Sequence, residues 1–193
     1  MRSLDVPLSE SDSRSLSAGD IVDVSGTVIT MRDEAHLRAL ETETLPFSLD
    51  GAVVYHCGPI MEKNGGGWRM VAGGPTTSAR MNALTPELLK RYPVRAIIGK
   101  GGMSHEVLEA MKARGCVYLS FTGGAAVLAA AGVRRVAGVH WEDLGMPEAA
   151  WELEADHFGP LVVAMDASGR SLYDDIKKQL EKRLPIIRNS LGF

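Results

Sequence analysis

Strand-like and helix-like segments alternate along the second half of the chain, and this alternation limits the folds open to it. Apolar strands are expected at 94–98, 116–121 and 136–140, with helices at 105–114 and 125–131 between them. Such alternation favours parallel strands joined by right-handed helical crossovers. The run at 94–98 has little polar alternation, which is typical of a strand buried on both faces. We therefore expect an α/β fold with a parallel or mixed sheet.

The first half of the chain is richer in strands and turns. Strands are expected at 21–30, 51–59 and 68–73, and a helix at 32–41. β-branched residues dominate 21–30 with a period near two, and Gly26 is expected to bend this strand. These elements predict a second, small β layer beside the α/β part.

The two ends of the chain carry weaker patterns. Residues 1–18 are polar and rich in serine, so we expect an N-terminal arm with one short helical turn capped by Ser9. A single domain is expected over 19–193. The remaining predictions are a mixture of loop and helix at 141–157, a strand at 158–166 and a charged amphipathic helix at 172–184.

Composition excludes several classes of partner. The chain has 193 residues, 45% hydrophobic content and a formal net charge of −3. These values suit an ordinary globular core and give no electrostatic reason to expect nucleic acid or a membrane surface as partner. No run approaches the ~18 apolar residues of a transmembrane helix. The polar, acid-containing N-terminus lacks the apolar core of a signal peptide, so we expect a cytoplasmic protein.

The cysteines and histidines do not predict a metal site. Cys57 and Cys116 are too few for a disulfide framework and lack the spacing of a metal motif. Each lies in or beside an apolar run, which favours buried structural thiols. None of the five histidines has a partner at the spacing of metal ligands.

The loops between Gly73 and Met103 carry the strongest chemical signal. A Gly-Gly-Pro turn leads into Thr76-Thr77-Ser78 and Arg80, and a second glycine-rich turn is Gly99-Lys100-Gly101-Gly102. Glycine lets backbone N–H groups approach a ligand closely. Arginine binds a carboxylate or phosphate with a planar fork, and lysine adds a point charge. Together these residues favour a site for a small anion.

Polar residues follow four of the predicted strands directly. They are Arg32, the segment 76–80, Lys100 and the segment 122–124. In a parallel β/α sheet, ligands collect beyond the carboxyl ends of the strands. A nucleotide is not expected, because Gly101 stands where a Walker motif has serine or threonine and no G-x-G-x-x-G follows a strand.

Each of these features also has a simpler structural explanation. The Gly-Gly-Pro turn can be an ordinary tight turn, and the three hydroxyls after it can be a helix N-cap cluster. Arg32 and Lys100, taken singly, can be solvated surface charges. Gly123-Gly124 can serve close packing or a helix start. Convergence at four strand ends favours the ligand site over these alternatives without removing them.

With these residues identified, the chain resembles the β subunit, or C-terminal half, of the class I fumarase and L(+)-tartrate dehydratase family of iron–sulfur-dependent hydro-lyases. Its most specific segments are Gly74-Pro75-Thr76-Thr77-Ser78-x-Arg80-Met81 and Gly99-Lys100-Gly101. The resemblance covers nearly the whole chain. Its other segments are Leu16-x-x-Gly19-Asp20, Gly26-Thr27, Arg32-Asp33-x-Ala35-His36, Gly58-Pro59, Gly123-Gly124-Ala125-Ala126 and Leu144-Gly145-Met146.

The resemblance implies a swivelling β/β/α domain and the reversible addition of water to a C4-type dicarboxylate. In the family, three cysteines of the α half hold a [4Fe–4S] cluster whose open iron acts as a Lewis acid. Since this chain has two cysteines, it cannot hold such a cluster alone. The resemblance therefore implies a cluster-bearing α subunit as partner. Homodimerisation is a further option that the sequence leaves open.

The resemblance also implies roles for individual residues. Arg32, Arg80 and Lys100 would hold the substrate carboxylate remote from the iron and stabilise the charge that develops there. Thr76 and Thr77 would contact the substrate, and Thr76 is the family's candidate base, provided that nearby cations lower the pKa of its hydroxyl. The implied catalytic residues are Thr76, Arg80 and Lys100, with Asp33, His36, Gly74, Ser78, Gly99 and Gly101 in support.

Three functions therefore compete at this level. The first is the β subunit of a hydro-lyase, and the second is a stand-alone dicarboxylate- or phosphate-binding module without catalysis. The third is a cofactor-free lyase that uses Lys100 as a Schiff base. Met31 stands where the family pattern leads us to expect a smaller residue. The sequence does not separate fumarate and malate from tartrate or methylated analogues.

Overall fold

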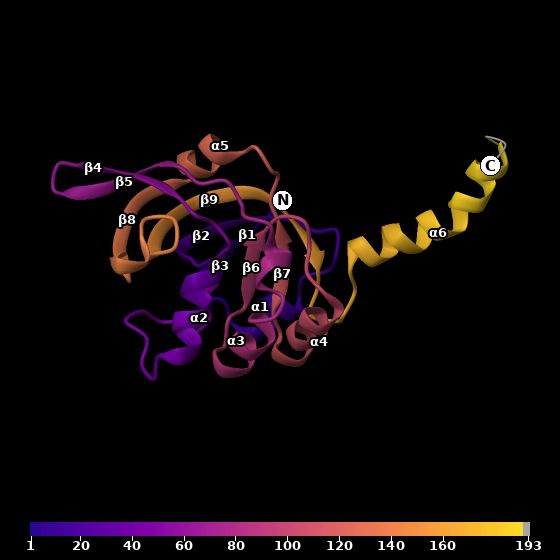
Figure 1. Ribbon diagram of the computed structural model, residues 1–193, viewed down its shortest axis with the longest axis horizontal. Helices are drawn as coiled ribbons and strands as arrows, with labels where there is room; N and C mark the ends of the chain where they lie inside the picture. The colour runs from indigo at the N-terminus through magenta and orange to yellow at the C-terminus, as the bar shows by residue number, and fades with distance from the viewer. Residues whose placement is uncertain (191–193) are drawn as a thin grey trace.

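The computed structural model describes residues 1–190, so the last three residues of the predicted domain, 191–193, lie outside this range. The described chain forms a seven-stranded mixed sheet in the order β1-β2-β3-β6-β7-β9-β8 and a two-stranded hairpin, β4-β5 (Figure 1). The strands are β1 (Arg2–Asp5), β2 (Ile21–Thr30), β3 (Val53–Tyr55), β4 (Ile60–Asn64), β5 (Gly67–Ala72), β6 (Ala96–Gly99), β7 (Val117–Ser120), β8 (Val133–His140) and β9 (Ala150–Met165). The α-helices are α1 (Glu10–Arg14), α2 (Asp33–Glu41), α3 (Thr85–Arg91), α4 (His105–Arg114), α5 (Ala126–Ala131) and α6 (Leu172–Ser190). Short 3-10 turns, η1 (Ser78–Met81) and η2 (Glu142–Leu144), complete the elements.

The centre of the sheet is parallel. β2 pairs with β3, β3 with β6, and β6 with β7, all in parallel register. Helices connect these strands, as the alternation of segments predicts for 94–98 and 116–121. The third predicted parallel strand, 136–140, lies in β8 instead, which pairs antiparallel with β9 at the edge of the sheet. The mixed sheet and the separate hairpin confirm the predicted α/β fold. The small β layer consists of β4 and β5 alone, because the strands predicted at 21–30 and 51–59 belong to the main sheet as β2 and β3.

The long strand β9 closes this sheet on itself. One stretch of β9 pairs antiparallel with β2, from Val162 opposite Ile21 to Glu152 opposite Ile29. Its C-terminal end also pairs antiparallel with β7, and its N-terminal half pairs with β8. Figure 1 shows β9 curving across the other strands. Because β2 and β7 share β9 as a neighbour, β2, β3, β6, β7 and β9 form a closed ring of strands.

The prediction of loop and helix over 141–157 is wrong for its second half, which belongs to β9. Trp151, Leu153 and Ala155 are buried, whereas Glu152 and Glu154 between them are partly exposed. This is the period-two pattern of a strand with one buried face. The acids obscure the pattern in the sequence because acidic residues are depleted in strands.

The segment predicted as an N-terminal arm contributes to the sheet instead. Arg2–Asp5 forms β1, which pairs in parallel with β2. The short helix α1 and its cap are confirmed: Ser9 is the N-cap, and Asp12 completes a capping box. Three leucines, Leu4, Leu8 and Leu16, are buried in the core, and their burial holds a mostly polar segment against the domain.

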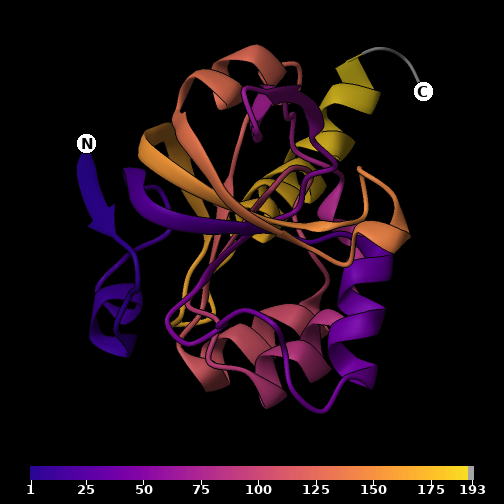
Figure 2. The ribbon, with the colours of Figure 1, turned by 90° about the vertical axis from the view of Figure 1, so that its left-hand side faces the viewer.

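Two apolar clusters lie on opposite faces of the central strands. Val53 and Tyr55 of β3 point into the closed ring of strands, whereas Val54 between them packs on the other face. The same alternation separates Ile98 of β6 from Ile97. Figures 1 and 2 show α2, α3 and α4 covering one side, with α5 and the β4-β5 hairpin on the other. Burial on both faces explains why these strands read as continuous apolar runs.

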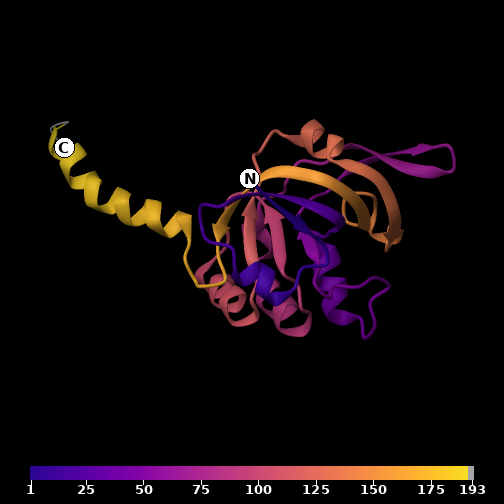
Figure 3. The same cartoon turned by 180° about the vertical axis from the view of Figure 1, so that it is seen from behind.

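The final helix, α6, is confirmed and continues beyond the predicted end at 184, through Pro185 to Ser190. Figures 1 and 3 show that it extends away from the rest of the chain. Within residues 1–190, no helix combines the length and apolar character that crossing a bilayer requires.

Truncation of a central strand should destabilise the chain strongly. Ile97 is fully buried, so Ile97→Ala should lower the free energy of unfolding by about 2–5 kcal/mol through lost burial and a residual cavity. The matched control is Ile60→Ala in the hairpin, where the side chain is 59% exposed; its effect should stay within about 0.5 kcal/mol. Equilibrium urea unfolding measures both, and equal effects would contradict this account of the core.

Candidate active site

The segment Thr76-Thr77-Ser78, called the threonine segment below, lies between the ends of two central strands, β3 and β6. The backbone N–H of Thr76 donates to the carbonyl of His56, which follows β3, at 2.7 Å. Lys100, which follows β6, donates its N–H to the Thr76 carbonyl at 3.3 Å and accepts from the Ser78 N–H at 3.0 Å. These bonds extend the pairing of the sheet past its last residues. They bring the two glycine-bounded loops side by side.

The ammonium group of Lys100 contacts one of the two threonines. Its Nζ donates to Oγ1 of Thr77 at 2.5 Å. The Thr76 hydroxyl has no hydrogen-bond partner in the part of the chain that the structure describes. The cation therefore acts directly on Thr77, while the hydroxyl of Thr76 is available to a ligand.

A carboxylate links the two arginines. Arg80, presented by η1, donates Nε to Asp33 Oδ1 at 3.2 Å, and its Nη2 lies 2.8 Å from Asp33 Oδ2. Arg32, the N-cap residue of α2, has its Nε 3.9 Å from the same Oδ2. Asp33 thus holds two cations from different elements close together. It bonds more closely to Arg80 than to Arg32.

Glu148 is a partner of Arg32 that the sequence analysis missed. Its Oε1 lies 2.9 Å from Arg32 Nη2, and its Oε2 accepts from the backbone N–H of Glu34 at 3.2 Å. The carboxylate therefore sits at the positive N-terminal end of α2. The one signal in the sequence is its position two residues after Leu144-Gly145-Met146. Nothing local indicates that it meets Arg32.

Glycines make room for several of these contacts. A Cβ at Gly58 would lie 2.1 Å from Arg32 Nη1, and one at Gly99 would lie 1.9 Å from Ser78 Oγ. Gly101 has φ +80°, a left-handed conformation that favours glycine. Gly74 packs against Ala126, where a Cβ would be 3.4 Å from the alanine Cβ. These positions account for three of the predicted supporting glycines and add Gly58.

Two other predicted supporting side chains, His36 and Ser78, are buried next to the loops of the candidate site. Nδ1 of buried His36 is 2.9 Å from the carbonyl of Arg32. Burial lowers the pKa of His36 to about 4, so its imidazole is neutral at pH 7 and adds no charge to the site. Buried Ser78 lies 2.9 Å from Nδ1 of His56.

The residues of this chain do not fit an iron–sulfur cluster. Cys57 and Cys116 are both buried, and burial raises the pKa of each thiol to about 12. A cluster needs deprotonated thiolates. Over residues 1–190, no group of three or more His, Cys, Asp or Glu side chains could hold a metal ion.

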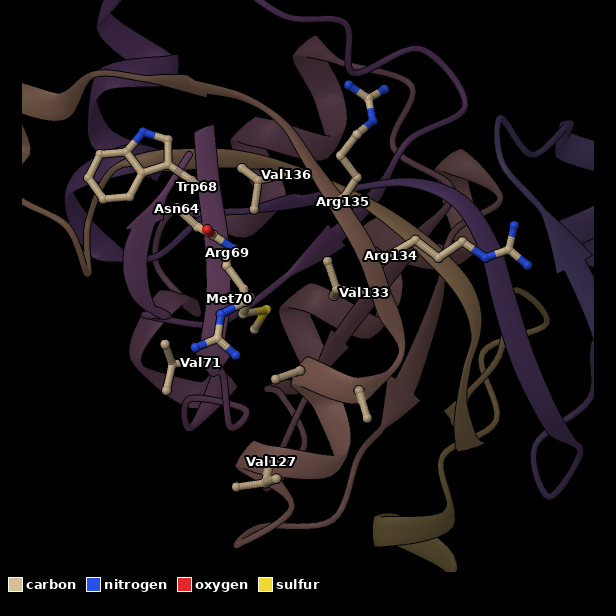
Figure 4. Close-up of a pocket in the computed structure, with 12 residues that line it drawn as sticks. Asn64, Trp68, Arg69, Met70, Val71, Val127, Val133, Arg134, Arg135 and Val136 are labelled. Carbon is tan, nitrogen blue, oxygen red and sulfur yellow. The ribbon is translucent and has the colours of Figure 1, made fainter. Parts of the chain in front are cut away.

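A separate cavity of about 510 Å³ lies between the β4-β5 hairpin, α5 and β8 (Figure 4). None of its lining residues is Arg32, Arg80 or Lys100, the three predicted substrate-binding cations. Its three arginines are each paired with an acid, Arg69 with Glu62, Arg134 with Asp156 and Arg135 with Glu154. Figure 4 shows Arg134 and Arg135 directed away from Arg69. Lys100, by contrast, has no acidic partner among the described residues, so this cavity is a poorer anion site than the loops around Lys100.

Fold and site together define a class: an α/β protein with Arg32 and Arg80 joined through Asp33, and Lys100 bonded to Thr77, on loops beyond the ends of its central strands. A family model described as the fumarase C-terminus matches residues 2–176. The chain belongs to this family.

Relatives in the family are similar over most of this chain. A putative L(+)-tartrate dehydratase subunit beta from Methanocaldococcus jannaschii is 47% identical over 92% of this chain and 93% of its own. The L(+)-tartrate dehydratase subunit beta from Escherichia coli is 39% identical over 95% and 92%. A putative fumarate hydratase class I from Geobacillus stearothermophilus is 41% identical over 93% of this chain, which corresponds to 35% of that protein.

A methyl group at Gly58 should displace Arg32. In Gly58→Ala the added Cβ would overlap the guanidinium and also lie 3.0 Å from the Pro147 carbonyl. We expect the Arg32–Glu148 pair, 2.9 Å here, to open beyond 4 Å in a crystal structure of the variant. Gly123→Ala is the matched control, because its Cβ would meet Lys100 at an ordinary 3.6 Å. An intact pair in Gly58→Ala would refute this role for the glycine.

Neither thiol should react while the chain is folded. Burial disfavours the thiolate, so with pKa values of about 12 both cysteines stay protonated and shielded at pH 8. Titration with Ellman's reagent should detect no fast-reacting thiol in the native chain and two after unfolding in guanidinium chloride. Rapid labelling of the native chain would show that Cys57 or Cys116 is accessible.

Proposed function

We propose that this chain is the β subunit of a hydro-lyase that adds water to, or removes it from, a C4-type dicarboxylate such as fumarate, malate or tartrate. The observation that carries the proposal is that Arg32 and Arg80 share Asp33, and Lys100 binds Thr77 beside Thr76, on adjoining loops in a member of the fumarase C-terminus family. The names of the relatives, tartrate dehydratase subunit beta and fumarate hydratase, support it.

The three cations suit the binding of a substrate carboxylate. Among the described residues Lys100 has no acidic partner, and its contact is the neutral hydroxyl of Thr77. Arg32 and Arg80 are held by Glu148 and Asp33. A guanidinium has five N–H donors, so each arginine keeps donors for a ligand. Charge-assisted hydrogen bonds of this kind are about twice as strong as neutral ones.

The same cations would serve the proton transfer. In dehydration, a base removes the proton from the carbon beside the carboxylate, and the hydroxyl leaves from the neighbouring carbon. The electron pair left by the proton spreads onto the carboxylate, where preorganised cations stabilise it. Thr76 is the proposed base and Thr77 contacts Lys100, so the cation acts on the pKa of Thr76 through space rather than through a bond.

A partner subunit is part of the proposal. Since Cys57 and Cys116 do not fit an iron–sulfur cluster, we assign the [4Fe–4S] cluster that the family resemblance implies to an α subunit. The matched segment makes up 35% of the putative fumarate hydratase from Geobacillus stearothermophilus, so most of that polypeptide has no counterpart here. A separate α chain, in a cytoplasmic complex, would supply it.

Loss of Lys100 should impair catalysis in the complex. The chain would be co-expressed with its α subunit, reconstituted anaerobically, and assayed with fumarate, malate and tartrate. The isolated chain should be inactive, and Lys100→Ala should lower kcat/KM of the complex by about 10²–10³-fold, as loss of one preorganised donor does. Lys90→Ala is the control, because Lys90 lies exposed on α3 and pairs with Glu87.

The outcomes separate the competing functions. Unchanged kcat/KM in Lys100→Ala would refute the site assignment. No turnover by a cluster-loaded complex, together with tight malate binding by the chain alone in calorimetry, would favour the stand-alone binding module. The substrate turned over with the highest kcat/KM identifies the dicarboxylate.

A further inference from the structure

The last helix, α6, carries a stripe of large apolar side chains along one face, called the α6 stripe below. Its members, Ile176, Leu180, Leu184 and Ile187, are between 39% and 63% exposed. They are four, four and three residues apart in the sequence, which places them on the same side of a helix. Single exposed apolar residues are common, but four in line indicate a surface that another molecule covers.

The first turn of α6 is fixed to the rest of the chain. Tyr173 donates its hydroxyl to Ser120 Oγ at 3.3 Å. Its ring lies against the Lys100 loop, where a Cβ added at Gly102 would be 2.7 Å from Tyr173 Cε2. Beyond this turn the helix extends away from the sheet and its covering helices (Figures 1 and 3). The α6 stripe is therefore held away from the core of its own chain.

The charges of α6 are unevenly distributed along the helix. Its first turn is acidic, with Asp174 and Asp175. After Glu181 is set aside, the charged residues that follow are basic: Lys177, Lys178, Lys182, Arg183 and Arg188. Two such helices side by side in parallel would place acid beside acid and base beside base. An antiparallel pair places the acidic end of each helix beside the basic end of the other, so α6 is complementary in charge to a second α6.

The same orientation agrees with the position of two charged residues beside the α6 stripe. Asp174 and Arg188 are 14 residues apart (188 − 174), close to four helical turns, so they lie on the same flank of the stripe. When two antiparallel helices pack stripe against stripe, equivalent flanks meet. The register that places Ile176 opposite Ile187 of the second copy also places Asp174 beside Arg188 of that copy.

Most of the α6 stripe lies outside the segment that the family shares. The family model matches residues 2–176, so Leu180, Leu184 and Ile187 come after it. The surface that an α subunit of the family would need is expected within the shared segment, where the candidate site lies. A second copy of this chain therefore suits the stripe better than the α subunit does.

We propose that α6 is a self-association surface, through which two copies of the chain pair antiparallel about a twofold axis, stripe against stripe. Such an isologous contact uses the same patch on both copies and closes at the dimer. Pairing removes both apolar stripes from water. It also brings the acidic first turn of each helix to the basic last turn of the other. The pairing does not rest on the proposed reaction.

Sedimentation velocity of the full chain over a dilution series tests the pairing. The wild-type chain should form a concentration-dependent dimer. Leu180→Glu introduces one charge per copy into the middle of the contact and should raise the dimer Kd about 100-fold or more. Leu128→Glu on α5 is the matched control, since Leu128 is 55% exposed and Leu180 54%, and it should leave the dimer intact. A monomer at all concentrations, or a dimer that Leu180→Glu does not weaken, would overturn the proposal.

Engineered cysteines test the antiparallel orientation. Cys57 and Cys116 are buried, so an added cysteine on α6 is the reporter. In the proposed register Ile176→Cys of one copy faces Ile187→Cys of the other, whereas two Ile176→Cys positions are about 16 Å apart along the helix, too far for a disulfide, which needs Cα atoms within about 7 Å. A mixture of the two single variants should cross-link on mild oxidation. Cross-linking of Ile176→Cys alone would show a parallel pair and overturn the proposal.

Two further measurements keep the outcomes decisive. Thermal unfolding identifies a variant that fails to fold, and the cross-link between the two cysteine variants then decides. The same cross-link should form in the complex with the α subunit. Its loss there would show that the α subunit covers α6 and would overturn the proposal. An inactive complex would count against the proposed function and leave the pairing to the measurements on the full chain.

Discussion

The antiparallel pairing of β9 with both β2 and β7 is the constraint on which the rest of the structure depends. Without it, β2 and β7 would be far apart in an open sheet, and the apolar side chains of β3 and β6 on that face would lie open to water. With it, the strands enclose one apolar cluster, while α2, α3 and α4 cover the other. Central strands buried on both faces have little freedom to shift. The loops that follow them therefore start from fixed positions.

That rigidity allows backbone hydrogen bonds to build the site. The Thr76–Ser78 segment follows the β4-β5 hairpin in the sequence. Its backbone forms hydrogen bonds with His56 after β3 and with Lys100 after β6. Asp33 and Glu148 then hold Arg80 and Arg32 in place. Acids beside cations reduce the net charge of the cluster, but they also orient the guanidinium groups before a ligand arrives. Such preorganisation lowers the cost of binding and of stabilising charge in a transition state.

Much of the fold could be predicted from local pattern. The helices α2 and α4, the register shift of β2 at Gly26 and the Ser9 cap follow from periodicity, glycine and capping residues. Two segments could not be predicted from local pattern. Acids between Trp151 and Ala155 conceal the alternation of β9, and three leucines among serines conceal a sheet-bound N-terminus. In both cases burial by distant residues outweighs local preference.

Within the candidate site, the sequence by itself determined which side chains are available: Arg32, Arg80 and Lys100, the hydroxyls beside them, and glycines where backbone must come close. It also determined that two cysteines are too few for a cluster. Only the tertiary structure decided the partners. Glu148 forms an ion pair with Arg32, and Lys100 donates to Thr77 rather than Thr76. The ring of His56 is hydrogen-bonded to Ser78 and packs against the ring of His36. Side-chain partners far apart in sequence are set by closure of the sheet and burial, and no local pattern records them.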